Sequence, residues 1–193
     1  NQRLAKLEDR VSSRRWKHIN NVIITDGPKQ PQFHPGCAVA IVRECLSALE
    51  ALHRSGIVHG DIKPGNIMIK RTGAAKIIDI GSAFTIDEPP EQRTCTPAYA
   101  APEVLRGEKA TPLSDLASLG YVLIELISGR NPFAGKKTYK EMIQAKIDLP
   151  QQVDDFIPKG IGNTALLTNF CRRLIAVDPA ERFHDASEAH LKQ

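Results

Sequence analysis

Two short segments of the chain carry side chains that could move a phosphoryl group. In the first, Asp61 is followed two residues later by Lys63 and five residues later by Asn66. In the second, Asp79 stands two residues before a glycine, at the end of a mostly apolar stretch. An aspartate can orient a hydroxyl and take its proton, and a lysine can neutralise charge on a phosphoryl group in transfer. An amide oxygen and a second carboxylate can hold Mg²⁺ against polyphosphate, so the spacing predicts a phosphoryl-transfer site.

Short strands must bring these two segments together. Apolar runs typical of short strands lie at residues 57–58, 66–69 and 75–78. A turn-like Arg-Thr-Gly sequence at 71–73 separates the last two runs. A strand–turn–strand unit of this kind would place Asn66 close to Asp79.

Helical periodicity dominates the rest of the chain. From Cys37 to Arg54 apolar residues repeat on one face, and Gly56 is the expected stop. We predict further helices at residues 2–15, 116–128, 138–146, 164–177 and 185–192. The 116–128 helix is apolar on most faces, so it should be buried all round. Residues 16–36 hold three prolines and two glycines and are expected to form a loop.

Five motifs, in family order, resemble those of eukaryotic-type serine/threonine protein kinases. Residues 59–66 resemble the catalytic loop H-R-D-x-K-x-x-N, and residues 79–81 resemble D-F-G. Residues 96–103 resemble the T-P-x-Y-x-A-P-E segment, residues 114–120 the S-D-x-W-S-L-G helix start, and residues 178–183 the D-P-x-x-R-F run. The resemblance implies a mainly α fold, the C-terminal lobe of the bilobal kinase-like fold, with short catalytic-loop β-hairpins.

The resemblance also implies roles for the four residues that could do the chemistry, called the chemical residues below: Asp61, Lys63, Asn66 and Asp79. Asp61 would be the catalytic base or the residue that orients the acceptor hydroxyl, and Lys63 would stabilise the γ-phosphate of ATP. Asn66 and Asp79 would be the Mg²⁺ ligands and, with Lys63, would form the cofactor site. Thr96 would help seat a protein substrate by hydrogen bonding toward Asp61 and Lys63.

Further residues would have structural roles. The resemblance implies a buried ion pair between Glu103 and Arg182 that anchors the activation segment. It also implies that Asp115 holds the catalytic-loop backbone from below. His59 is expected to be architectural and not catalytic.

Two positions depart from the family pattern. Gly60 replaces an arginine that commonly pairs with a phosphorylated activation-loop residue, so phosphorylation-gated ordering by that route is not expected. Thr85, Thr94 and Thr96 remain candidate phosphate acceptors. Ile80 replaces phenylalanine at a position expected to pack beneath the motif, where an apolar side chain should be tolerated.

The sequence shows no Gly-rich loop, no strand lysine and no helix glutamate of the kind that the kinase N-terminal lobe supplies. The residues before Cys37 are too few for a five-stranded lobe, so we expect residues 1–193 to be a C-terminal lobe alone. Such a chain should bind nucleotide weakly and need an N-terminal lobe or a partner to complete the ATP site. Its exposed cleft would also favour self-association.

Two other functions stay open. A pseudokinase or docking lobe without catalysis is favoured by the missing lobe, Gly60 and Ile80, but the four chemical residues are all retained. A small-molecule or Rio-like phosphotransferase is favoured because residues 59–61 fit such enzymes better than they fit H-R-D. Those enzymes generally lack the Lys63 pattern and the 96–103 segment.

Composition narrows the classes of partner. The chain is 41% hydrophobic and 25% charged with a net charge of +4, which is typical of a globular domain. Aromatic residues make up only 5% and form no stripe with basic residues, so no nucleic-acid role is expected. No apolar run is long enough to span a bilayer, and no membrane role is expected. The cysteines form no C-x-x-C pair or zinc spacing, and Cys45 and Cys171 fall in apolar helical patterns typical of core residues, so a cytoplasmic location is expected.

Overall fold

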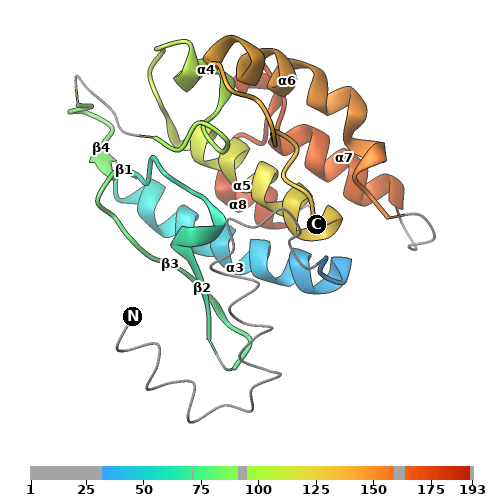
Figure 1. Cartoon of the computed structure of the whole chain (residues 1–193). Coiled ribbons are helices and arrows are strands. Elements are labelled where there is room, and N and C mark those ends of the chain that lie inside the picture. The colour runs from blue at the N-terminus through green and yellow to red at the C-terminus, as the bar shows by residue number, and fades with distance from the viewer. Residues whose placement is uncertain (1–31, 71, 91–94, 159–163, 192–193) are drawn as a thin grey trace, which may run out of the picture.

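Helix α5, Pro112–Ser128, lies at the centre of the fold (Figure 1). Every residue from Ser114 to Ile127 is buried, as its apolar sequence predicts. The helix starts four residues before the predicted Leu116, because a capping box formed by Thr111 and Ser114 satisfies its first N–H groups. It ends at Gly129, which takes a left-handed conformation with φ of 66°.

The computed structural model describes residues 32–70, 72–90, 95–158 and 164–191. The predicted 2–15 helix and residues 16–31 of the predicted loop lie outside these ranges. Around α5 the chain forms α3 (Pro35–Arg54), β1 (Ile57–Val58), η1 (Pro64–Asn66), β2 (Ile67–Ile69), β3 (Ala75–Ile77), β4 (Phe84–Thr85), α4 (Pro102–Leu105), α6 (Tyr139–Gln152), η2 (Val153–Asp155), α7 (Thr164–Leu174), η3 (Pro179–Glu181) and α8 (Ala186–Leu191).

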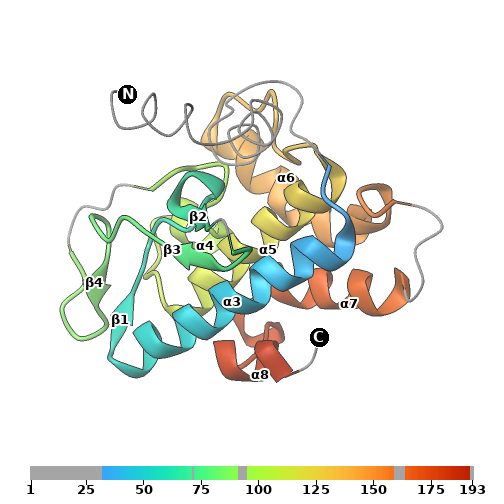
Figure 2. The ribbon, with the colours of Figure 1, turned by 90° about the horizontal axis from the view of Figure 1, so that it is seen from below.

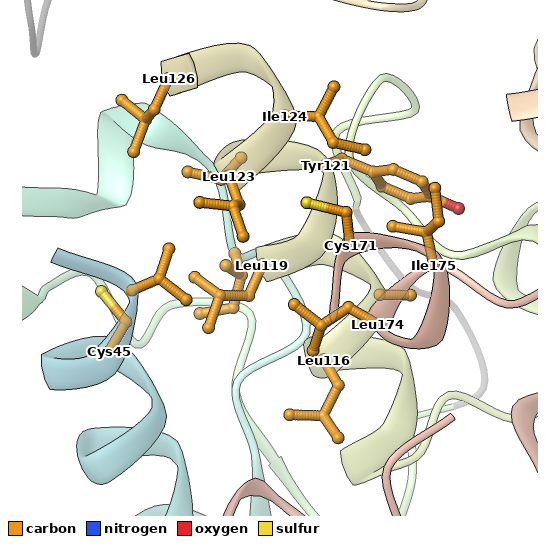
Figure 3. Packing of buried hydrophobic residues seen from close by; sticks show 14 of the residues in the cluster. Cys45, Leu116, Leu119, Tyr121, Leu123, Ile124, Leu126, Cys171, Leu174 and Ile175 are labelled. Atoms are coloured by element: carbon orange, nitrogen blue, oxygen red, sulfur yellow. The ribbon is translucent and has the colours of Figure 1, made fainter. Parts of the chain in front are cut away.

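Helices α3 and α7 pack on two sides of α5, and α8 packs on α3 (Figure 2). Figure 3 shows Cys45 of α3 near Leu119 on one side, with Cys171 and Leu174 of α7 on the other. The contact with α7 is close, because a Cβ on Gly120 would lie 2.6 Å from Ile175 Cγ2. The hydrophobic core is therefore a helix sandwich with α5 in the middle.

Two small antiparallel pairs hold the segments that carry the chemical residues. Strands β2 and β3 form the predicted hairpin, with Ile67 opposite Ile77. Strand β1 pairs with β4, which was not predicted from the sequence. The chain between β3 and β4 therefore runs from one pair to the other, and it carries Asp79.

Several helix bounds differ from the sequence expectation. Helix α3 begins at Pro35 and not at Cys37, so the last two residues of the predicted 16–36 loop are helical; the His34 side chain accepts from Gly36 N at 3.3 Å. Helix α7 ends at Leu174 and not at Val177. No helix in the described part of the chain is both long and apolar enough to cross a membrane.

Helix α6 shows why one prediction was wrong. The sequence placed its end at Lys146, but the helix continues to Gln152 with Pro150 inside it. Proline has no N–H to donate to the carbonyl of Lys146, which would normally end a helix there. Burial of Leu149 and of Val153, and a 3.0 Å hydrogen bond from Arg172 Nε to the Pro150 carbonyl, hold the extra turn in place.

Candidate functional site

The catalytic-loop segment is fixed from below by a buried carboxylate of α5. Asp115 Oδ2 accepts a 2.8 Å hydrogen bond from the backbone N–H of His59, and Oδ1 accepts one of 2.9 Å from Gly60. His53 Nε2 of α3 lies 2.9 Å from the same carboxylate. Asp115 therefore lies beneath the loop that leads to Asp61 and accepts hydrogen bonds from two of its N–H groups.

His59 joins the same loop to the strand before Asp79. It is completely buried, and its Nδ1 accepts from the backbone N–H of Asp61 at 3.3 Å. Its Nε2 lies 3.4 Å from the Ile78 carbonyl, so this nitrogen is the one placed to donate. These contacts are architectural, because both ring nitrogens are directed at backbone groups.

Gly60 is held in a conformation that other residues avoid. Its φ is +78°, and a Cβ built there would lie 2.8 Å from the Ser82 carbonyl oxygen. Both facts favour glycine, because left-handed backbone is costly for any residue with a Cβ. The local backbone conformation therefore disfavours an arginine at this position.

Asp61, Lys63 and Thr96 form a triangle of direct contacts. Lys63 Nζ lies 2.6 Å from Asp61 Oδ2 and donates to Thr96 Oγ1 at 2.9 Å. The backbone N–H of Thr96 donates to Asp61 Oδ1 at 3.1 Å. Two residues of the catalytic loop and one from the 96–103 segment, 33 positions beyond Lys63, thus meet at one point.

The triangle sets the protonation of its carboxylate. Partial burial acts to raise the pKa of Asp61, but hydrogen bonds from Lys63 and Thr96 and the charge of Lys63 outweigh it. The pKa of Asp61 therefore lies below its usual value. The group is ionised at neutral pH and can accept a hydrogen bond from a hydroxyl.

Asn66 and Asp79 lie close together, as the predicted hairpin requires. The backbone N–H of Ile78 donates to the Asn66 carbonyl at 2.8 Å, which brings residue 66 beside the neighbour of Asp79. The Asn66 side chain is buried and donates from Nδ2 to the Asp61 carbonyl at 2.9 Å and to Asp61 Oδ2 at 3.3 Å. Its side-chain oxygen is therefore the atom available to a cation.

Asp79 has the one positive φ among the described residues other than glycine, at 63°. Aspartate tolerates this region better than most residues, and such backbone often marks functional sites. Its side chain is exposed and accepts from the backbone N–H of Gly81 at 3.2 Å.

The donor set fits Mg²⁺ bound together with polyphosphate. Within the described ranges no group of three or more His, Cys, Asp or Glu side chains could enclose a metal ion. Mg²⁺ characteristically takes one or two carboxylates and completes its octahedral shell with phosphate oxygens and water. Asn66 and Asp79 suit that mode and do not suit a metal held by protein alone.

Ile80 lies differently from the sequence expectation. It was expected to pack beneath the motif, but 71% of its surface is exposed. Met68 and Ile78 are also exposed, at 39% and 37%. The expectation was wrong because the described residues provide nothing that covers this side of the chain, and an apolar surface therefore borders Asp79.

A second cluster, away from the chemical residues, contains the Glu103–Arg182 pair. Arg182 Nη1 and Nη2 donate to Glu103 Oε1 and Oε2 at 2.7 and 2.8 Å, a bidentate geometry. Arg182 also donates to the carbonyls of Ala176 and Leu113, and Ser114 Oγ donates to Glu103. Burial acts to raise the pKa of Glu103, but Arg182 outweighs it and holds that pKa below its usual value.

Sequence reasoning missed a third group, which braces residues 96–99. Tyr99 Oη donates to Glu125 Oε2 at 2.7 Å, and Asn131 Nδ2 donates to the same oxygen at 3.0 Å. Lys146 Nζ donates to the Ala98 carbonyl at 2.8 Å. A signal for Glu125 was present, because a carboxylate within a helix buried all round must find polar partners.

Comparison with known proteins adds family evidence to this geometry. A family model described as "Protein kinase domain" matches residues 15–192. A probable serine/threonine-protein kinase of Corynebacterium efficiens is 33% identical over 180 residues, covering 89% of this chain and 26% of that relative. Serine/threonine-protein kinase PknB of Mycobacterium leprae is 34% identical over 179 residues, covering 88% of this chain and 27% of its own length.

A probable PknB of Bifidobacterium longum is 36% identical over 149 residues, with 74% of this chain and 21% of that protein covered. The chain thus spans about a quarter of the length of these relatives. The family model covers all of the described residues, including the Asp61 triangle and the Glu103–Arg182 pair. The chain therefore belongs to the protein kinase domain family, as a eukaryotic-type serine/threonine protein kinase.

Proposed function

We propose that the chain is the C-terminal lobe of a serine/threonine kinase and carries out the phosphoryl-transfer and substrate-binding half of its reaction. The observation that carries this proposal is the triangle of Asp61, Lys63 and Thr96. It brings a carboxylate, a cation and the hydroxyl of Thr96 within hydrogen-bond reach of one another. Thr96 belongs to the segment of this chain that would seat the substrate. An acceptor hydroxyl near Asp61 would then lie beside the positive charge that a transferring phosphoryl group needs.

The lowered pKa of Asp61 favours one of its two possible roles. A carboxylate held ionised by Lys63 and Thr96 is a weak proton acceptor in the ground state. It is a good hydrogen-bond acceptor, so Asp61 would align the serine or threonine hydroxyl for in-line attack. Lys63 would neutralise charge on the γ-phosphate, and Thr96 would hold both side chains and the substrate segment in register.

ATP with Mg²⁺ is the proposed cofactor. Asn66 Oδ1 and the exposed carboxylate of Asp79 would hold the ion, whose chemistry is to neutralise phosphate oxygens during transfer. The contribution of this chain is positional. The hydrogen bonds from Asn66 Nδ2 to Asp61 tie the metal ligand directly to the residue that would orient the acceptor.

A second body would complete the ATP site. The exposed apolar side chains of Met68, Ile78 and Ile80 border Asp79, and surfaces of this kind are usually covered by a partner. An N-terminal lobe or a separate partner would supply that cover, and self-association would be the alternative when the chain is alone. Low activity of the isolated chain follows from the same view. The four free cysteines agree with a cytoplasmic location.

The two other functions have weaker support. A pseudokinase or docking lobe is not favoured by Gly60, because the local backbone requires glycine there whether or not the site is active. A small-molecule or Rio-like phosphotransferase would not need the segment around Thr96, which here contacts both Asp61 and Lys63. Both contacts favour a protein acceptor.

The proposal is tested with the longer protein that carries this domain, mixed with Mg²⁺, γ-labelled ATP and a basic acceptor protein. We expect label on serine or threonine, and its loss in Asp61→Asn and Asp79→Asn variants. Lys140→Met, on the exposed start of α6, serves as the matched control. A folded wild-type protein that transfers no label, or an Asp61→Asn variant as active as wild type, would refute the proposal.

A further inference from the structure

Lys146 is a buried lysine on α6 that the proposed reaction does not use. None of its surface is exposed, and its Nζ donates to the carbonyl oxygen of Ala98 at 2.8 Å. The Nζ atom lies 3.7 Å from the centre of the Phe133 ring and 4.0 Å from that of Tyr121. A carbonyl and two aromatic faces thus surround it, in place of the paired carboxylate that a buried cation usually has.

The charges around Lys146 do not explain why a lysine is there. Burial lowers the pKa of Lys146 to about 6, against the fields of Cys95 in the activation segment and Glu103 of α4, which act to raise it. Glu103 itself is occupied by Arg182 at 2.7 Å. The Tyr121 hydroxyl of α5 stays neutral, because burial raises its pKa. An apolar side chain would fill this site without the desolvation cost of burying an amine. The contribution that only the lysine makes is its hydrogen bond to the Ala98 carbonyl.

Ala98 occupies the middle of the segment that would seat the acceptor. Two residues earlier, Thr96 is tied to Asp61 and Lys63. One residue later, Tyr99 is tied to Glu125 of α5. The segment is therefore bonded to the catalytic loop at Thr96, to α6 at Ala98 and to the central helix α5 at Tyr99. Lys146 supplies the middle bond.

We propose that Lys146 is a positioning residue for the acceptor substrate, which acts by fixing the Ala98 carbonyl and with it the path of residues 96–99. This inference rests on the proposed kinase function and deepens it. The proposed Mg²⁺ ligands Asn66 and Asp79 lie at the two ends of the β2–β3 hairpin, and their side chains hydrogen-bond with Asp61 and Gly81. Loss of Lys146 should therefore weaken use of the acceptor and leave ATP binding unchanged.

Lys146→Met is the test variant, because methionine is unbranched and apolar and fills most of the same space. Hydrogen exchange measured on this chain should quicken about fivefold at the N–H groups of Tyr99 and Ala100, the effect of losing one hydrogen bond. Both N–H groups donate to the Thr96 carbonyl, at 2.9 and 3.0 Å. Exchange within α5 should not change. Lys140→Met, on the same helix but exposed, should leave both regions as in wild type.

Kinetics of the longer protein supply the second measurement. Lys146→Met should raise the KM for the acceptor about fivefold, again the effect of one hydrogen bond, with the KM for ATP unchanged. Lys146→Gln keeps an N–H donor and should give intermediate values. If the methionine variant does not fold, the glutamine variant decides the question by the same measurements.

The outcomes separate this inference from the proposed function. Unchanged exchange at Tyr99 and Ala100, or equal acceleration within α5, would overturn the positioning role of Lys146. An equal rise in the KM for ATP would do the same. If the wild-type protein transfers no phosphate, the proposed function fails, and the exchange experiment still decides whether Lys146 fixes the 96–99 segment.

Discussion

Two of the carboxylate–cation pairs of this molecule, Glu103–Arg182 and Asp61–Lys63, lie in opposite surroundings. The Glu103 and Arg182 side chains are 5% and 0% exposed, whereas those of Asp61 and Lys63 are 12% and 30% exposed. Arg182 is committed to Glu103 and to backbone carbonyls of two other segments. Lys63 is shared between Asp61 and Thr96 and keeps an open side. The first pair suits an anchor, and the second is placed to meet a ligand.

From this difference we expect the Glu103–Arg182 region to contribute to stability and the Asp61–Lys63 region to the reaction. A buried pair is costly to break because its remaining partner is left charged and without solvent. A partly exposed pair costs little to break, because water replaces the lost partner. Substitutions in the Glu103 region should therefore change the free energy of unfolding, and substitutions at Asp61 should change the rate of transfer.

Replacement of Arg182 should have the largest effect on folding. Arg182→Met leaves Glu103 buried and ionised without its bidentate partner, which should lower the free energy of unfolding by about 3–5 kcal/mol. Urea denaturation followed by circular dichroism would measure it. Arg54→Met is the matched control, since Arg54 pairs with Glu50 on the surface at 3.2 Å and should change stability by less than about 0.5 kcal/mol. Equal effects of the two variants would contradict the anchor assignment.

The close contact between α5 and α7 gives the next largest effect. In Gly120→Ala the new Cβ would lie 2.6 Å from Ile175 Cγ2 and 2.8 Å from Leu174 Cβ. Overpacking of this kind should destabilise the fold by about 1–3 kcal/mol, measured by the same urea titration. Gly36→Ala on α3 is the control, because its nearest contact is 3.4 Å away. A neutral Gly120→Ala variant would show that the helices can separate without cost.

Gly60 tests whether the reactive region also depends on backbone geometry. Gly60→Ala places a Cβ at φ of +78° and 2.8 Å from the Ser82 carbonyl, while Gly73→Ala places one at φ of +90° with nothing within 4 Å. The left-handed conformation alone should cost about 1–2 kcal/mol in both variants. Gly60→Ala should cost more than Gly73→Ala by unfolding titration, because of the collision. Equal losses would mean that residue 60 is glycine for its φ alone.

The residues of the candidate site could be picked out from the sequence because they occur as spaced sets. Asp61, Lys63 and Asn66 share one loop, and hairpin pairing then determines where Asp79 must lie. The long apolar run of α5 was equally clear. Motif spacing and periodicity are properties of many residues at once, and single exceptions do not hide them.

Single residues whose role depends on distant neighbours could not be predicted. Lys146 looked like the end of a helix, because Pro150 follows it, and only packing against the Ala98 segment shows its contact. Ile80 looked like a core residue, because its type is apolar, and its exposure depends on what lies over it. Both errors arise from tertiary context overriding a local signal.

The smallest effect on folding is expected at the residue with the largest expected effect on the reaction. Asp61→Asn should change the free energy of unfolding at pH 7 by less than about 1 kcal/mol, since the pair that it breaks is partly exposed. In the longer protein it should lower the rate of transfer about 10²-fold, the usual cost of misplacing the attacking group.

The prediction for Asp61→Asn can also be tested through the pH dependence of the free energy of unfolding. The pKa of Asp61 is below its usual 3.8 in the folded chain, so its stabilising contribution is present above that value and is lost as the pH falls through the folded pKa. Any stability difference between wild type and Asp61→Asn at pH 7 should therefore shrink in acid. Glu103→Gln should differ from wild type by more at pH 7, because its pair is fully desolvated. A loss in Asp61→Asn as large as that in Glu103→Gln would remove the distinction between anchor and reactive pair.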